Sequence, residues 1–275
     1  MRIRLGETRF SNTAFVRHAL LSGALREELT LVSAHPPELA EMLLRSEIDA
    51  APASSIFYAL HPERLAVLRG FSISAFGSTG SILVFSSRAS ALEELEGMRI
   101  SATRASAASV ALLRILLGEL GVDAEVVENQ EPRLERMLSS HDAALLIGDD
   151  ALAGAHAHPE LVISDLGEEW RRLTGMPMVY ALWMLSPEAA RRPELVERVS
   201  RLLTLAREYA WENLQELASE HARRLGIPEE SMRRHLESLD YTLSGRHLRA
   251  LERYFTLAER HGVIPRAPES MRVVG

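Results

Sequence analysis

The alternation of short apolar runs with helical patterns, up to about residue 185, most constrains the fold of this chain. The apolar runs end at turn residues and predict strands. They are Ile3–Leu5, Leu29–Val32, Ile48–Ala51, Leu65–Leu68, Ile82–Phe85, Met98–Ile100, Ala124–Val127, Ala143–Ile147, Leu161–Ile163 and Met178–Leu185. Helical patterns lie between them at about 13–22, 37–45, 54–60, 106–119, 131–139, 149–154 and 166–174. This order is typical of parallel sheets with crossover helices, so we predict an α/β fold.

The pattern changes after Pro187. Apolar residues keep helical spacing over 191–223, and two more helices are predicted near 228–238 and 244–262. Glutamate and arginine occupy the outer faces of these helices, which is more often a solvated surface than a partner site. We therefore expect a helical tail that completes the first part of the fold.

About ten strands are too many for one small sheet, and a chain of 275 residues fits roughly two domains. We expect Ile82–Phe85 and Met178–Leu185 to connect two lobes as paired strands. Lobe one would contain 1–85 and 181–275 with the helical tail, and lobe two 86–180. A ligand would bind in the cleft between the lobes, where strand ends meet helix N-termini.

The charged residues limit the chemistry available to this chain. It carries 31 basic and 38 acidic residues, a formal charge of −7, which argues against a nucleic-acid partner. Every basic residue is arginine, so a lysine Schiff base and a P-loop lysine are excluded. The absence of cysteine excludes disulfides, thiolate nucleophiles and cysteine-bound metals. A small anion remains possible, because local donors can outweigh the global charge.

The sequence also predicts where the protein works and what it needs. The first residues are not followed by the apolar segment of a secretory signal, and no stretch is long and apolar enough to cross a membrane. We therefore expect a cytoplasmic protein without a membrane partner. His156 and His158 lack partners at ligand spacing, so we expect no metal. The oligomeric state is not predicted.

Two serine-rich helix starts are candidate anion sites, one in each expected lobe. Ser106 precedes the helix Val110–Leu120 as a candidate N-cap, with Ser109 in the first turn, and backbone N–H groups near Ser106 and Ala107 are candidate anion donors. Ser54 and Ser55 repeat this arrangement after the third strand. Free N–H groups and the helix dipole favour a carboxylate or phosphate at such positions. The alternative is that these serines only cap their helices.

Three further segments carry candidate site residues. In the loop 77–81, Gly80 allows close approach of a ligand and Ser81 offers a hydroxyl, although an ordinary turn would look the same. Asn12 opens the first helix as either a cap or a ligand contact, and Arg9 beside it either pairs with a carboxylate or lies in solvent.

The third segment, Gly148 and Asp149, ends a buried run and starts a helix. The acid suits a helix N-terminus and is also able to contact a substrate hydroxyl.

Four segments together resemble the chorismate dehydratase (MqnA) family of the futalosine route to menaquinone. They are Asp49-x-Ala-Pro52-x-Ser54-Ser55-Ile-x-Tyr58, Gly77-x-x-x-Ser81-Ile-Leu-Val-Phe-Ser86, Leu146-Ile-Gly-Asp149-x-Ala-Leu152 and Asp165-Leu-Gly-x-x-Trp170-x-x-Leu-Thr174-Gly-x-Pro177-x-Val-Tyr-Ala-x-Trp183. The last two are the most specific. The resemblance covers about residues 3–185, and the length of the helical tail also fits the family.

The resemblance implies a two-lobed fold like that of type II periplasmic binding proteins, and dehydration of chorismate, a small dicarboxylate, without a cofactor. It implies that Asn12 and Ser81 are catalytic. The chain departs from the family where Ser-Arg-Thr-Ser usually precedes the lobe-two helix, and here reads Ser106-Ala-Ala-Ser109. Arg104 lies close enough to supply that charge. Phe15 and Met178 also replace a proline and a phenylalanine that are common in the family.

Two alternatives remain open. The sister family, 1,4-dihydroxy-6-naphthoate synthase, shares the fold and the pathway, but it carries a histidine where this chain has Gly148. A non-catalytic protein that binds small anions would use the same fold. Turnover of chorismate separates an enzyme from a binding protein.

Overall fold

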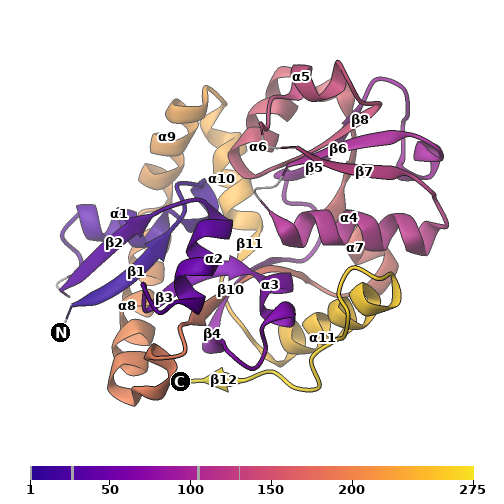
Figure 1. Cartoon of the computed structure of the whole chain (residues 1–275). Helices are drawn as coiled ribbons and strands as arrows, with labels where there is room; N and C mark the ends of the chain where they lie inside the picture. The colour runs from indigo at the N-terminus through magenta and orange to yellow at the C-terminus, as the bar shows by residue number, and fades with distance from the viewer. Residues whose placement is uncertain (1, 26–27, 104–105, 130) are drawn as a thin grey trace.

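The computed structural model describes residues 2–25, 28–103, 106–129 and 131–275. Within these ranges, seven strands form one sheet: β1 (Ile3–Glu7), β2 (Leu29–Ser33), β3 (Ala50–Ser54), β4 (Ala66–Ala75), β10 (Met178–Leu185), β11 (Leu239–Asp240) and β12 (Val273–Val274). Five strands form a second sheet: β5 (Ile82–Ser86), β6 (Arg99–Thr103), β7 (Glu125–Asn129), β8 (Ala143–Ile147) and β9 (Val162–Asp165). The predicted α/β class is confirmed, with the two sheets side by side (Figure 1).

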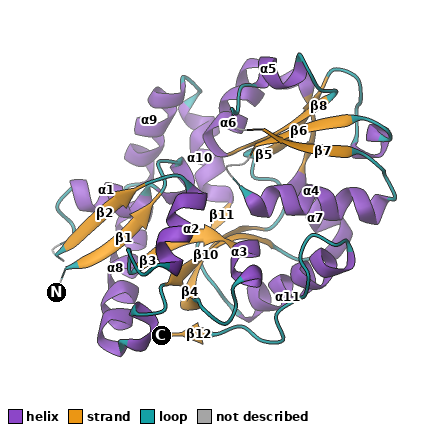
Figure 2. Cartoon of the chain, in the orientation of Figure 1, coloured by secondary structure: helices purple, strands orange, loops and turns teal. Residues whose placement is uncertain are grey.

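Helices cover both sheets. Those around the first sheet are α1 (Phe15–Leu21), α2 (Pro36–Leu44), α3 (Ser55–Leu60), α8 (Pro193–Glu212), α9 (Leu214–Leu225), α10 (Glu229–Ser238) and α11 (Gly245–Arg260). Those around the second are α4 (Ala107–Leu120), α5 (Leu134–Leu138), α6 (Gly148–Ala157) and α7 (Leu166–Thr174). Figure 2 shows helices on both sides of the five-stranded sheet.

The sheets are mixed, whereas the alternation predicted parallel sheets. The order is β11-β4-β10-β3-β1-β2 in the first, with β12 beside β4, and β7-β6-β8-β5-β9 in the second. β10 runs antiparallel to β3 and β4, and β5 runs antiparallel to β8 and β9. The chain reaches each of these two strands from the other sheet, and not through a crossover helix that returns to the same sheet. The parallel direction that such a crossover imposes is therefore not required.

β5 and β10 do not act as paired connectors. β5 pairs with β8 and β9, while β10 pairs with β3 and β4, so each strand belongs to one sheet. Residues 82–85 therefore lie in the second sheet and 178–180 in the first, the reverse of our expectation. The chain crosses between the sheets through the loop 76–81 and through 175–177.

Apolar residues on both faces of the five-stranded sheet explain why its strands read as continuous apolar runs. Leu83 and Phe85 join a buried cluster with Leu134 of α5, whereas Val84 joins the cluster that contains Leu113 of α4. The sheet is therefore enclosed between two helical layers.

The predicted helical tail is present, although the pattern over 191–223 forms two helices that break at Asn213. α8 packs on α1 and β4, and α11 packs on β10 and α3 and also touches α4. In the described part of the chain, no helix is both long and apolar enough to span a membrane.

Candidate active site

A cavity of about 230 Å³ lies between the two sheets, with walls from both. Seven of the predicted site residues line it: Asn12, Ser54, Ser81, Ser106, Ala107, Ser109 and Gly148. They come from the segments that follow β1, β3 and β8, from the start of β5 and from the start of α4. The structure thus brings together residues that are up to 136 positions apart, 148 minus 12, in the sequence.

Ser81 is buried at the start of β5 and its hydroxyl is held from one side. The Thr79 hydroxyl oxygen accepts hydrogen bonds from the Ser81 N–H at 3.2 Å and from the Ser81 Oγ at 3.1 Å. The Ser81 carbonyl accepts a hydrogen bond from the Gly148 N–H at 2.6 Å. Ser81 therefore has a fixed position at the point where β5 meets the start of α6.

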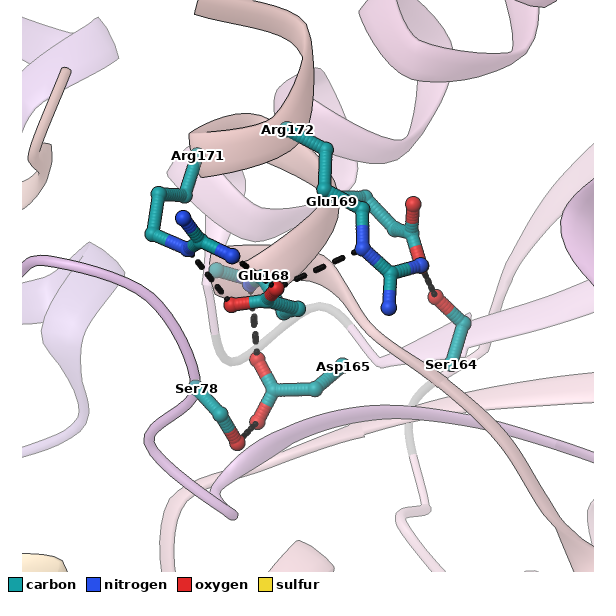
Figure 3. Close-up of polar contacts among 8 residues, drawn as sticks. Ser78, Ser164, Asp165, Glu168, Glu169, Arg171 and Arg172 are labelled. Atoms are coloured by element: carbon teal, nitrogen blue, oxygen red, sulfur yellow. Dashed lines mark hydrogen bonds and ion pairs between the residues drawn. The ribbon is translucent and has the colours of Figure 1, made fainter. Parts of the chain in front are cut away.

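Asp165 fixes the loop that leads to Ser81. One carboxylate oxygen accepts hydrogen bonds from the Ser78 hydroxyl at 2.7 Å and from the Thr79 and Gly80 N–H groups at 3.0 and 2.8 Å. The other oxygen caps α7 by accepting from the Gly167 N–H at 2.9 Å and the Glu168 N–H at 3.4 Å. Figure 3 shows Asp165 between Ser78 and the start of α7. The predicted binding residue Gly80 does not line the cavity, and its N–H belongs to this anchor.

A glycine and a histidine support the same loop. A Cβ atom at Gly167 would collide with the carbonyl oxygen of Gly77, so only glycine lets the loop lie against the start of α7. On the other side, Nδ1 of His235 in α10 lies 2.9 Å from the Thr79 carbonyl oxygen. Burial lowers the pKa of His235, so the ring is neutral and donates this hydrogen bond from Nδ1.

Asn12 lies in the short helix η1 (Ser11–Thr13), and its side chain caps neither η1 nor α1. Its Oδ1 atom is buried and has no hydrogen-bond partner among the described residues. The capping interpretation of Asn12 is therefore wrong, and its side-chain oxygen is free to meet a ligand.

Asp149, a predicted contact to substrate, lies outside the cavity wall. Its Oδ1 accepts hydrogen bonds from the Ser11 N–H at 3.1 Å and the Ser11 hydroxyl at 2.6 Å, and its Oδ2 lies 2.5 Å from Arg224 of α9. Asp149 thus fixes the residue next to Asn12. Arg9 is exposed and also lies outside this cavity, with its carbonyl oxygen 3.2 Å from the Arg224 guanidinium.

The two adjacent serines before α3 differ. Ser54 lines the cavity, makes no capping hydrogen bond and has a buried Oγ without a partner in the described structure. The Ser55 hydroxyl points elsewhere and donates to the Val179 carbonyl at 2.7 Å, which ties α3 to β10. Ser55 is therefore a structural residue rather than a binding residue.

Ser106 caps α4 as predicted, because its Oγ accepts a hydrogen bond from the Ser109 N–H at 3.3 Å. The N-terminus of α4 therefore opens on the cavity and favours a negatively charged ligand. Arg104 lies outside the described residues.

Gly148 starts α6 with φ of +57°, and a Cβ atom there would lie 3.2 Å from the Phe10 ring. The first turn of α6 carries Asp149 and Asp150, and its Gly148 N–H is bonded to the Ser81 carbonyl, so α6 does not add a second anion site.

The described cavity wall contains neither arginine nor histidine, and its titratable members are Glu41 and Tyr180. Glu41 is exposed and lies 3.6 Å from Arg45. Burial raises the pKa of Tyr180 well above its usual value, so this residue is neutral. Among the described residues, no group of three or more acidic and histidine side chains suits a metal ion.

The sequence interpretation missed Thr79 and Tyr180. Thr79 lies in the loop 77–81, where only the glycines and serines drew attention as ligand contacts. Tyr180 lies inside the fourth family-like segment, but its pattern carried no sign of a cavity. An irregular register with β4 places it there, and such a bulge has no clear signature in a single strand.

Solved structures show which fold encloses this cavity. The alkanesulfonate-binding protein SsuA from Xanthomonas axonopodis pv. citri matches with a TM-score of 0.75 and 17% identity, covering 99% of this chain and 98% of that one. A Candida albicans protein described as having the generic periplasmic binding protein fold matches with a TM-score of 0.70 and 12% identity over 98% and 92%. The chain therefore has the periplasmic-binding-protein fold.

The sequence relatives are more specific. A family model described as menaquinone biosynthesis matches residues 3–260. A Thermus thermophilus protein named chorismate dehydratase is 33% identical over 254 residues, covering 87% of this chain and 89% of that protein. This chain belongs to the menaquinone biosynthesis family, and the family resemblance read from the sequence is confirmed.

Proposed function

We propose that this protein is a chorismate dehydratase, which converts chorismate to 3-[(1-carboxyvinyl)oxy]benzoate and water in the futalosine route to menaquinone. The observation that carries the proposal is that Asn12 and Ser81, which match the family's catalytic positions, line one cavity on which the N-terminus of α4 opens. The family membership and the Thermus thermophilus relative support the same activity.

Neutral donors would hold the two carboxylates of chorismate. The N-terminus of α4 presents Ser106, Ala107 and Ser109 to the cavity. N–H groups at a helix start bind anions without a formal positive charge. Ser54 adds a hydroxyl whose oxygen has no other partner in the described structure.

The reaction needs a proton acceptor that the described cavity wall does not offer. Lysine and cysteine are absent from the chain, and the carboxylate of Glu41 is exposed at the rim beside Arg45. We therefore assign proton removal to the enolpyruvyl carboxylate of the substrate. The electron pair of the broken ring C–H bond forms a ring double bond and the allylic C–O bond breaks. The leaving hydroxide takes up the proton held by the enolpyruvyl carboxyl group, which releases water and restores the carboxylate.

The protein would contribute orientation and hydrogen bonds to this reaction. Binding would fold the enolpyruvyl group over the ring, while Ser81 and Asn12 contact the departing hydroxyl. The driving force is the aromatic ring that forms, so no metal or organic cofactor takes part in any step.

The fold would supply the cleft. We propose that the two sheets and their helices act as two lobes linked by the loop 76–81 and by 175–177, and that substrate enters between them. We also propose a cytoplasmic location, which the biosynthetic role named for its family supports.

Incubation of purified protein with chorismate tests the proposal. We expect an ultraviolet-absorbing aromatic product with the mass of chorismate minus water, at a rate that a chelator leaves unchanged. Binding of chorismate without turnover would support the non-catalytic alternative. Formation of 1,4-dihydroxy-6-naphthoate from a later intermediate of the pathway, with no action on chorismate, would support the sister activity.

A further inference from the structure

Thr79 is the residue of the loop 77–81 whose backbone is held on both sides. Its N–H donates to the Asp165 carboxylate at 3.0 Å, and its carbonyl oxygen accepts from Nδ1 of His235 at 2.9 Å. Its hydroxyl oxygen accepts from the N–H and from the hydroxyl of Ser81, at 3.2 and 3.1 Å. Two separate parts of the fold thus fix the backbone of Thr79, while its side chain serves Ser81.

The hydroxyl of Ser81 depends on Thr79 for its direction. Ser81 is 4% exposed, and among the described residues Thr79 is the only hydrogen-bond partner of its hydroxyl. A serine side chain has three staggered rotamers, and a hydrogen bond or close packing is needed to select one of them. Because Ser81 lines the cavity, this selection decides where its oxygen lies relative to a bound ligand.

Threonine is well suited to hold a neighbouring hydroxyl. Branching at Cβ restricts its rotation about χ1, and Thr79 is as buried as Ser81, with 4% exposure. A hydroxyl oxygen accepts two hydrogen bonds, and at Thr79 both come from Ser81, one from its backbone and one from its side chain. A shift of Thr79 would therefore move both groups of Ser81 together.

We propose that Thr79 is a positioning residue, which acts on the reaction by setting the orientation of the Ser81 hydroxyl. The effect on turnover rests on the proposed function, in which Ser81 contacts the departing hydroxyl. The orientation itself does not, because it follows from the contacts of Thr79 with Asp165, His235 and Ser81. Orientation matters for the rate, since a displacement of about 1 Å costs on the order of 10².

The Thr79→Val variant keeps the branched shape of the side chain and removes the acceptor. We expect kcat for chorismate to fall about 10–100-fold, with KM close to the parent's value, because the ligand-binding groups stay in place. Thr79→Ser restores the hydroxyl and should recover most of the lost kcat. A Thr79→Val variant with the parent's kcat, or a Thr79→Ser variant without recovery, would overturn the proposal.

A double variant separates positioning from direct contact with the substrate. In a Ser81→Ala background the hydroxyl that Thr79 orients is gone, so adding Thr79→Val should cause no further loss of kcat. Losses that multiply in the double variant would mean that Thr79 acts on the substrate itself, and the positioning role would be rejected.

Ser86, at the other end of β5, provides a control for lost stability. Its buried hydroxyl oxygen also accepts two hydrogen bonds, from the N–H groups of Arg88 and Ala89 at 3.0 and 3.1 Å. Ser86→Ala and Thr79→Val should both melt at a lower temperature than the parent, but Ser86→Ala should keep the parent's kcat. An equal fall of kcat in both variants would leave Thr79 with a structural role only.

A crystal structure of Thr79→Val tests the orientation without any turnover. We expect the Ser81 side chain to occupy a different rotamer from that in the parent, or more than one. If the parent does not act on chorismate, the proposed function fails, while this comparison of rotamers remains valid. A Ser81 side chain that keeps the parent's single rotamer in Thr79→Val would contradict the proposal.

Discussion

Ser81 and Asn12 line the cavity from opposite sheets. Within the described residues, neither side chain has its full set of hydrogen-bond partners. Ser81 lies against Thr79, and Asn12 Oδ1 has no partner in the described structure. Hydrogen-bonding side chains placed in advance beside a departing hydroxyl lower the reaction barrier, because little reorganisation is needed as charge develops.

Replacing either residue by alanine should therefore reduce catalysis more than stability. For Ser81→Ala and Asn12→Ala we expect kcat to fall on the order of 10²–10³, equivalent to roughly 2.7–4 kcal/mol of barrier. Steady-state kinetics and a thermal melt check this expectation. A parent-like kcat with a lowered midpoint in both variants would remove Ser81 and Asn12 from the mechanism.

The neighbouring serines Ser54 and Ser55 provide a matched pair. Ser54→Ala should raise KM for chorismate with little change in the free energy of unfolding. Ser55→Ala should leave KM unchanged and lower the free energy of unfolding by about 1 kcal/mol, because it loses the hydrogen bond to Val179. Urea unfolding and kinetics of both variants test this, and an exchange of the two effects would refute the assignment.

These serines also show what the sequence predicts about single residues and what it does not. It predicts which segment carries the site, because serine at a helix start either caps the helix or binds a ligand. It does not say which of two adjacent hydroxyls faces the cavity, since that depends on β10 lying beside β3. The same limit explains Asp149, whose carboxylate has a buried partner, Ser11, 138 residues away in the sequence.

The loop 77–80 and helix α7 depend on one carboxylate. Asp165 caps α7 with one oxygen and holds three donors of the loop with the other. Asp165→Ala should lower the free energy of unfolding by about 1–2 kcal/mol through the lost cap, and should lower kcat because Ser81 follows the loop. A melt and kinetics measure the two effects.

Ser164→Ala is the control for this prediction. It removes a hydrogen bond to Glu169 on the same helix and leaves the loop untouched, so kcat should stay at the parent value. If Asp165→Ala destabilises the protein but keeps kcat, the loop does not need its anchor for catalysis.

The secondary structure was largely predictable from the sequence, because its signals are local. β8, β10 and α7 have the predicted limits, since each apolar run or helical pattern ends at a glycine, a proline or a capping residue. β11 and β12 were missed because two residues carry no periodicity. The direction of β5 and β10 was also missed, because it depends on the route of the chain between the sheets.

Helix α9 ties distant parts of the molecule together. Arg224 contacts Asp149 at the start of α6, and Asp149 in turn holds Ser11 beside Asn12. Losing this cation should loosen the contact between the two sheet regions. For Arg224→Gln we expect KM for chorismate to rise several-fold, because Asp149 then holds Ser11 beside Asn12 less firmly. The radius of gyration of the ligand-free variant, measured by small-angle X-ray scattering, should increase.

Arg223→Gln is the matched control on the same helix, since Arg223 contacts the Ser219 carbonyl one turn earlier. It should behave like the parent in both measurements. Equal effects of the two substitutions would indicate a general loss of charge on α9 rather than the loss of this tie.

The position of β4 has a consequence for the nascent chain during translation. Its partners β10, β11 and β12 are synthesised long after it, with Val67 pairing with Val273. All five strands of the other sheet lie between Ile82 and Asp165. That region can therefore complete its core before the strands that pair with β4 have been synthesised. Until then β4 presents unpaired backbone groups, the kind of edge that chaperones cover and that otherwise promotes aggregation. The sheet whose first strands leave the ribosome earliest is thus the last to be completed.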